Sequence, residues 1–118
     1  MGEHVEVAVS RTPSDGVPVV AVHGEVDVYS APALKGSLTE LLSSGAKTVV
    51  VDLSGVGFLD STGLGALVEA RAATSEAGGT LPLVCSQERI LKLFTITGLD
   101  GAFTIHPTVD EALAALRG

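Results

Sequence analysis

The stretch Thr48–Leu67, TVVVDLSGVGFLDSTGLGAL, constrains the fold of this chain more than any other part of it. Residues Thr48–Leu53 are apolar at nearly every position, which is typical of a central strand that is covered on both faces. Residues 54–60 are rich in glycine and are predicted to form a loop. A helix is predicted over Ser61–Ala77, so the stretch indicates a strand, a loop and a helix in succession.

The rest of the chain continues this alternation of strands and helices. Further strands are predicted at Val5–Val9, Val17–His23, Leu81–Cys85 and Phe103–His106. Further helices are predicted after Ser30, Ser86 and Thr108, each of which can cap a helix N-terminus. The turn formers of residues 11–16 join the first two strands into an antiparallel hairpin. Because strands alternate with helices after that hairpin, we expect an α/β protein with a mixed, mostly parallel sheet and right-handed crossovers.

Composition and charge limit the class of protein. The 118 residues favour a single domain over residues 1–118, and a hydrophobic content of 46% excludes disorder as the main state. Aromatic residues make up only 3%, which leaves few side chains to stack on bases or sugars. Because the formal net charge is −7, nucleic acid and anionic membranes are poor partners, and a basic protein surface is a better one.

The single cysteine and the N-terminal sequence indicate a compartment. Cys85 lies in the apolar run LPLVC, has no second cysteine to pair with, and is predicted to be a buried strand thiol. The first residues, MGEHVEVAV, lack the basic and apolar regions of a signal peptide. No apolar run approaches the ~18 residues that suggest a membrane helix. We therefore expect a cytoplasmic protein without a membrane partner.

Ser61 is the candidate functional residue. In open α/β sheets the working groups lie just beyond the carboxyl ends of strands, and Ser61 follows such a strand and loop. Gly55 and Gly57 are expected to let the loop turn tightly. Gly63 and Gly65 are expected to keep the first helical turn bare, so that another backbone can approach closely. Each of these two costs the helix roughly 1 kcal/mol relative to alanine, which favours a reason other than helix propensity for their presence.

Spacing alone leaves two interpretations of the sequence Asp60-Ser61-Thr62 open. Either one of these side chains is only the N-cap of the helix, or Ser61 accepts a phosphate. A phosphate would be stabilised by the free N–H groups and the dipole of the helix N-terminus. It would add about −1.5 to −2 charges beside Asp60 and near Asp27 and Asp52, at a cost on the order of 2–3 kcal/mol for each charge pair. A partner docked over the loop would be expelled, which makes a binding switch without a change of fold.

Other kinds of site are disfavoured by the sequence. Asp52 ends an apolar strand, as the phospho-acceptor of a receiver domain does, but no early acidic pair is present to hold magnesium. Ser61 lacks the G-x-S-x-G elbow of a serine hydrolase. His4, His23 and His106 are scattered without the spacing of metal ligands, and no nucleotide-binding glycine loop is found. We therefore expect no metal, no cofactor and no catalytic residue.

Three segments carry a similarity to a known family, namely VVVDLSGVGFLDSTGLGAL, GEVDVYSAPALKGSL and GLDGAFTIHPTVDEALAAL. The chain resembles the STAS domain, and within that family the bacterial anti-sigma factor antagonists, for which the DSTGLG stretch is specific. The similarity covers nearly the whole chain from Val5. The resemblance implies a mixed sheet with helices packed mainly on one face, in a protein that binds partners and is not an enzyme.

The resemblance also implies a mechanism of partner switching. The serine matching Ser61 is phosphorylated by an anti-sigma factor that is also an ATP-dependent serine kinase, with Thr62 as the less favoured acceptor. The unphosphorylated antagonist binds that partner and frees the sigma factor, and a metal-dependent serine phosphatase restores binding after phosphorylation has ended it. Asp27 matches an acidic position near the acceptor, and Asp60 helps to bind or position the kinase. The residues expected to contact the partner are Asp27, Asp60, Ser61, Thr62, Gly63, Leu64 and Gly65.

Two other functions remain open from the sequence. One is a STAS regulator that binds a nucleotide or another small ligand, for example as a subunit serving a lipid transporter. The other is an enzyme that uses Ser61 covalently. Tight binding of GTP or ATP would favour the first, and reaction of Ser61 with an organophosphorus probe would favour the second.

Overall fold

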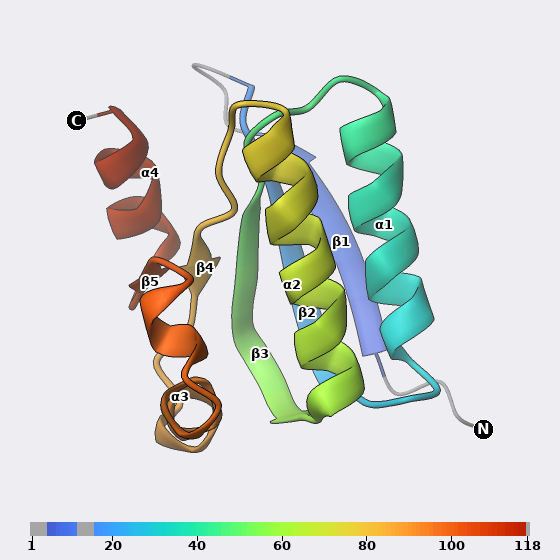
Figure 1. Ribbon diagram of the computed structural model, residues 1–118, viewed down its shortest axis with the longest axis vertical. Helices are drawn as coiled ribbons and strands as arrows, with labels where there is room; N and C mark the ends of the chain where they lie inside the picture. The colour runs from blue at the N-terminus through green and yellow to red at the C-terminus, as the bar shows by residue number, and fades with distance from the viewer. Residues whose placement is uncertain (1–4, 12–15, 118) are drawn as a thin grey trace.

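The chain folds around one sheet, and the computed structural model describes residues 5–11 and 16–117 of it (Figure 1). The strands are β1 (Val5–Arg11), β2 (Pro18–Val26), β3 (Val50–Leu59), β4 (Leu83–Val84) and β5 (Ile105–His106). The helices are α1 (Ala31–Ser43), α2 (Ser61–Glu76), α3 (Glu88–Ile96) and α4 (Val109–Arg117), with a short 3-10 turn η1 at Leu99–Gly101. The predicted order, two strands followed by alternating helices and strands, is confirmed.

The sheet is mixed, as predicted. β1 and β2 are antiparallel, with Val7 opposite Val22, whereas β2, β3, β4 and β5 are parallel to one another. The strands lie in the sheet in their order along the chain, so α1, α2 and α3 each connect two parallel neighbours. Part of the predicted turn at 11–16 lies outside the described residues.

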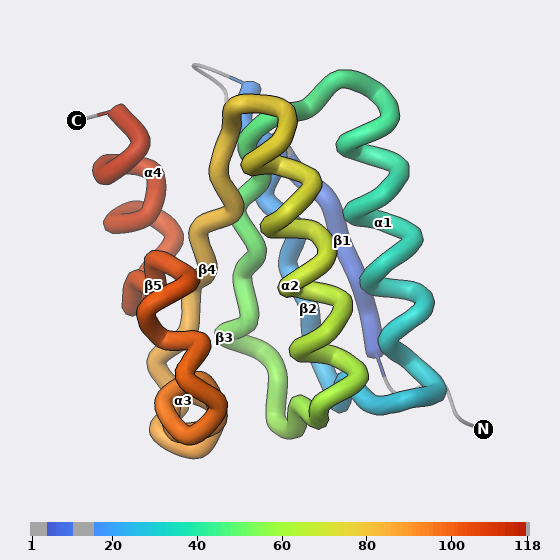
Figure 2. The backbone as a smooth tube through the Cα atoms, in the orientation of Figure 1, coloured from blue at the N-terminus to red at the C-terminus, as the bar shows by residue number. Residues whose placement is uncertain are grey.

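Two layers of helix cover the sheet unequally. Figure 2 shows α1 and α2 running side by side across β1, β2 and β3. Together with α3 they cover one face, where the buried cluster includes Val20, Leu34, Val51, Leu67 and Phe94. α4 covers part of the other face, where a smaller cluster joins Val19, Val50 and Val84 to Ala112 and Leu113. Three helices on one face and one on the other confirm the expected arrangement, and they explain why the start of β3 is apolar on both sides.

Strand lengths differ from the prediction in both directions. β2 extends to Val26 and β3 to Leu59, past the predicted ends at His23 and Leu53, because these two strands stay paired with each other. β4 and β5 are two residues each, shorter than predicted, because each ladder on that side of the sheet covers only two residue pairs. The long strands therefore lie beside α2, where the candidate residues are.

Of the predicted helix caps, one is confirmed and two are wrong. Thr108 caps α4, since its Oγ1 accepts a hydrogen bond of 3.1 Å from the backbone N–H of Glu111. Ser30 precedes α1, but its side chain makes no capping bond to that helix. Gln87, and not Ser86, precedes α3, again without a side-chain cap. Ser30 and Gln87 instead bond to the backbone of the strands, which is a competing use of a polar side chain near a helix start.

Candidate functional site

The last residues of β3 carry the candidate site, although the sequence predicts a loop there. Pairing with β2 passes from Ala21↔Asp52 to His23↔Gly55 and then from Gly24↔Val56 to Glu25↔Phe58. At each of these two steps β3 contains one residue more than β2, which is the pattern of a β-bulge. Bulges bend a strand and increase its twist, so the end of β3 is re-aimed while it stays in the sheet.

The predicted role of Gly55 and Gly57 in a tight turn is wrong. Both residues lie in β3, and neither has a positive φ. The imidazole of His23, on β2, occupies the space where a Cβ at position 55 would lie. Gly55 is therefore required by the packing of a neighbouring side chain, whereas a Cβ at position 57 would meet no atom within 4 Å.

Gln87 holds the extended part of β3 in place, a role that no local sequence pattern indicates. Its Nε2 donates to the carbonyl oxygens of Leu53 at 2.8 Å, Val56 at 2.7 Å and Ser54 at 3.2 Å. β4 pairs with β3 over two residues only, so these carbonyls have passed the end of the ladder. One side-chain amide thus replaces the missing strand and fixes the segment that leads to α2.

Cys85 follows β4 directly and is buried, which confirms the predicted buried thiol, although it lies just beyond the observed strand. Burial raises the pKa of the Cys85 thiol, and a hydrogen bond to the backbone of Gln87 opposes that rise. Its Sγ also donates to Gln87 Oε1 at 3.4 Å. The thiol is therefore a packing group beside the support of β3.

Asp60 is the N-cap of α2, so the capping role that the sequence left open among Asp60, Ser61 and Thr62 belongs to Asp60. Its Oδ1 accepts hydrogen bonds from the backbone N–H groups of Thr62 at 3.0 Å and Gly63 at 3.1 Å. Ser61 is the first residue of the helix and is exposed, as is Thr62. These two N–H groups are not free to bind a phosphate on Ser61, so the expectation that they would stabilise it is wrong. The capping carboxylate already uses them.

The ends of β2 and β3 bring a second carboxylate beside the first. The backbone N–H of Asp60 donates to the carbonyl of Val26 at 3.2 Å, so Asp27, the next residue, lies at the neighbouring strand end. Asp52 does not lie there, although it was expected near Ser61. It lies near the start of β3, and at about 3.3 Å per residue the strand alone separates it from Leu59 by roughly 20 Å. Its Oδ1 accepts from the N–H and the hydroxyl of Ser54.

The three residues that follow in α2 divide between the interior and the surface. Gly63 is buried, and a Cβ there would meet the side chains of Leu59 and Val26 at 2.5 and 2.7 Å. Leu64 is part of the core. Gly65 is exposed, and a Cβ there would meet no atom within 4 Å. The expectation that Gly63 leaves room for an approaching backbone is therefore wrong, because the side chains of Leu59 and Val26 fill that space. Gly63 and Leu64 lie beneath the site, while Gly65 lies open as expected.

Gly65 lines a groove between the first halves of α1 and α2. The groove has a volume of about 370 Å³ and is lined by Ala31, Pro32, Lys35, Thr62, Gly65, Ala66 and Glu69. An ion pair of 2.9 Å between Lys35 Nζ and Glu69 Oε1 bridges the two helices at this groove. Both partners are more than half exposed, so we expect the pair to add little to stability.

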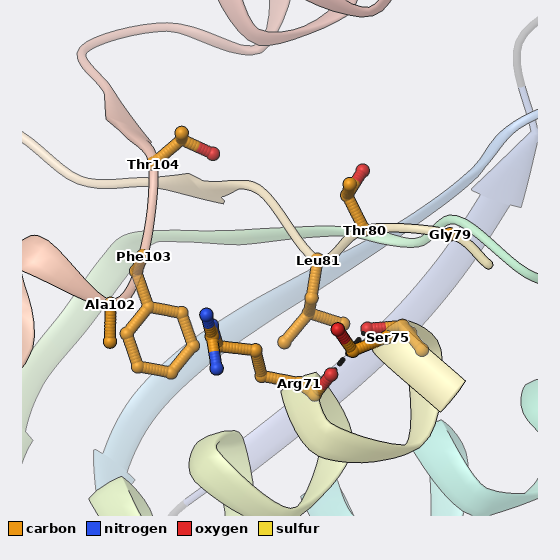
Figure 3. A pocket seen from close by; sticks show the side chains of 9 residues that line it. Arg71, Ser75, Gly79, Thr80, Leu81, Ala102, Phe103 and Thr104 are labelled. Carbon is orange, nitrogen blue, oxygen red and sulfur yellow. Dashed lines mark hydrogen bonds between the residues drawn. The ribbon is translucent and has the colours of Figure 1, made fainter. Parts of the chain in front are cut away.

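A separate pocket lies at the opposite end of α2, around Arg71 (Figure 3). The Arg71 guanidinium lies over the ring of Phe103 at 6.0 Å, and hydroxyls of Thr80 and Thr104 are among the other lining groups. Its volume of about 210 Å³ is below the roughly 300 Å³ at which ordinary small-molecule pockets begin. The candidate residues around Ser61 do not line this pocket.

Metal-binding clusters and membrane-spanning helices are absent from the residues that the structure describes. No group of three or more His, Cys, Asp or Glu side chains within residues 5–11 and 16–117 is arranged to hold a metal ion. In the same residues, no helix has the length and apolar character needed to cross a membrane.

Comparison with known proteins identifies the family. The model of the STAS domain matches residues 8–112. The anti-sigma-B factor antagonist of Bacillus subtilis (strain 168) is 44% identical over 80 residues, which cover 68% of this chain and 72% of that protein. The protein of the same name from Staphylococcus aureus (strain NCTC 8325 / PS 47) is 37% identical over 91 residues, covering 77% and 84%. The crystal structure of an anti-sigma factor antagonist from Mycobacterium paratuberculosis is 36% identical, with a TM-score of 0.84 over 97% of this chain and 95% of that one. The chain therefore belongs to the STAS domain family.

Proposed function

We propose that this protein is an anti-sigma factor antagonist whose binding is switched at Ser61. In the unphosphorylated state it binds an anti-sigma factor that is also a serine kinase, and the sigma factor is released. Phosphorylation of Ser61 ends that binding, and a serine phosphatase restores it. The protein acts in the cytoplasm by binding and does not catalyse a reaction. The observation that carries the proposal is the exposed Ser61 hydroxyl at the start of α2, next to the capping carboxylate of Asp60.

The charges at the two strand ends explain how a phosphate would act. Thr62 and Gly63 already donate their N–H groups to Asp60, so the phosphate stays in solvent beside an existing negative charge. Asp27, at the neighbouring strand end, adds a second carboxylate to the same edge. A partner that covers this edge must remove the phosphate, with its roughly two negative charges, from water. Each 1.4 kcal/mol of that cost lowers affinity about tenfold. The fold need not change, because the cap of α2 remains in place.

The surface around Ser61 supports a protein partner over a small substrate. Ser61 lines neither of the pockets described above, and the neighbouring groove between α1 and α2 is lined mainly by small side chains and is open at Gly65. A backbone segment can approach such a surface closely because Gly65 presents no side chain. The neighbouring carboxylate, Asp60, is engaged in the cap and is therefore poorly placed to activate Ser61 as a nucleophile.

Phosphopeptide mapping after incubation with the cognate anti-sigma kinase and ATP tests the proposal. We expect one phosphate on Ser61, no incorporation into Ser61→Ala, and unchanged incorporation into Thr62→Ala. Ser61→Asp should weaken binding to the anti-sigma factor at least tenfold, while Ser61→Ala should bind as the unmodified protein does. Label confined to Thr62 would move the acceptor by one residue, and equal binding of Ser61→Asp and Ser61→Ala would refute the charge mechanism.

A further inference from the structure

An apolar groove lies beside the end of β3, on the side of Ser61 that faces α3. The groove has a volume of about 280 Å³, and its apolar lining comes from Phe58, Leu59, Ile90, Leu93 and Ile96. Phe58 is 44% exposed and Ile96 is 74% exposed. Leu59 is the residue before Asp60, and Figure 1 shows α3 at the same end of the sheet as the start of α2. The groove is thus continuous with the edge that carries Ser61.

Exposed apolar side chains of the described residues gather at this edge. Of the seven large ones, four lie here, namely Val28, Tyr29, Phe58 and Ile96. Val28 and Tyr29 follow the end of β2, and Tyr29 is 80% exposed. Contiguous exposed apolar surface on a soluble domain marks a site of interaction, whereas single exposed residues need no explanation. Exposed apolar side chains therefore lie at both of the strand ends that meet beside Ser61.

The charges of the groove indicate what can enter it. Arg89 and Lys92 line it together with the apolar residues, and no carboxylate of the described residues does. These are two of the seven basic residues of a chain whose formal net charge is −7, so the groove is a local exception on an acidic protein. A segment that fills it needs an apolar side chain for the floor and carboxylates for the two cations.

We propose that the groove between β3 and α3 is a docking site for an acidic, apolar segment of the anti-sigma partner. An aliphatic or aromatic anchor of that segment packs between Phe58 and Ile96, and its flanking carboxylates pair with Arg89 and Lys92. The inference rests on the proposed function, because the groove holds the same partner that covers Ser61. Docking here is separate from the switch, since no residue of the groove is modified.

Binding of the purified anti-sigma factor, measured by titration calorimetry, tests this inference with matched variants. Ile96→Ser should weaken binding at least tenfold, because the side chain is exposed and its loss leaves the fold intact. Leu116→Ser removes an exposed leucine from α4, on the other face, and should bind normally. The double variant Arg89→Glu and Lys92→Glu should also lose at least tenfold, whereas Lys47→Glu, at the opposite end of β3, should not. Added salt should weaken binding of the unmodified protein more than binding of the double variant.

The outcomes separate this inference from the proposed function. Normal binding by Ile96→Ser and by the double variant, with loss of binding in Ser61→Asp, overturns the groove and leaves the switch at Ser61 standing. Absence of binding by the unmodified protein removes both proposals. Sedimentation of the protein alone tests whether a second copy of this chain occupies the groove. A dimer that Ile96→Ser dissociates would assign the groove to a second copy of this chain and overturn the partner segment.

Discussion

The junctions between β2 and α1 and between β3 and α2 share one turn geometry but differ in the exposure of their serine. In each, an aspartate follows the strand and its Oδ1 accepts from the backbone N–H groups two and three residues later. Asp27 accepts from Tyr29 and Ser30, both at 3.0 Å, and Asp60 accepts from Thr62 and Gly63. Each aspartate thus turns the chain from a strand end toward a helix.

The serine at each junction shows what the difference means. Ser30 is 3% exposed, its hydroxyl donates to the carbonyl of Glu25 at 2.7 Å, and it accepts from the N–H of Asp27 at 2.9 Å. Ser61 is exposed, and within the described residues its hydroxyl makes no hydrogen bond. The shared aspartate therefore serves the turn, while the environment of the serine decides whether another protein can reach it.

The largest effect on stability should separate these two serines. Ser30→Ala removes the buried hydroxyl that accepts from the N–H of Asp27 and donates to the carbonyl of Glu25, and we expect a loss of about 2 kcal/mol in the free energy of unfolding. Ser61→Ala should change that free energy by less than about 0.5 kcal/mol, as exposed substitutions do. Urea denaturation of both variants measures the difference. Equal losses would show that the two serines are both structural and would break the comparison.

The support given by Gln87 sharpens the comparison, because only the β3 end of the described junctions depends on it. Gln87→Leu keeps most of the side-chain volume but removes the donor to Leu53 and Val56, at a cost of about 1–2 kcal/mol. Hydrogen exchange should then become faster at the end of β3 and the start of α2, and stay unchanged at the start of α1. A uniform increase over both junctions would instead indicate a global loss of stability.

The order of elements and the mixed sheet could be predicted from the sequence because they depend on local patterns, and the same patterns indicate Ser61 as the candidate site. We can recognise the apolar run at the start of β3 and the aspartate before α2 from their neighbours along the chain alone. The end of β3 was missed because Gly55 and Gly57 resemble a loop, and only the pairing with β2 keeps them in the sheet. The partner of that segment, Gln87, lies over thirty residues away along the chain. No spacing rule connects a glutamine before one helix to the carbonyls of another strand.

The different environments of Ser30 and Ser61 could be recognised only from the three-dimensional structure. Ser30 and Ser61 both precede or begin a predicted helix, and nothing in the neighbouring residues distinguishes a hydroxyl that bonds to a strand from one that faces solvent. Thr108 differs because its partner, Glu111, lies three residues on and the pattern is local. Sequence patterns therefore predicted where the serines lie along the chain, and the packing of β2 against β3 determined which one is accessible.

The carboxylate of Asp60 has two roles that can be separated by substitution. Asp60→Ala removes the cap of α2 and should lower the free energy of unfolding by about 1 kcal/mol. Asp60→Asn keeps an acceptor of similar capping strength and should cost little stability, but it removes the charge. If that charge positions the kinase, phosphorylation of Asp60→Asn should slow by up to about fivefold, the range for an exposed charge pair. Wild-type rates with Asp60→Asn would leave the aspartate as a cap alone.

Two exposed glycines, one in each helix, separate α1 and α2 by function. Gly36 in α1 and Gly65 in α2 are both exposed, and a Cβ at either position meets no atom within 4 Å. Alanine at each should stabilise its helix by up to about 1 kcal/mol. Gly65, however, lines the groove beside Thr62, so a methyl group there occupies space that an approaching backbone would use. We expect Gly65→Ala to bind the anti-sigma factor several-fold more weakly and Gly36→Ala to bind normally, although both melt at higher temperature. Normal binding by Gly65→Ala would place the partner away from this groove, and a binding loss in Gly36→Ala would extend the contact surface along α1.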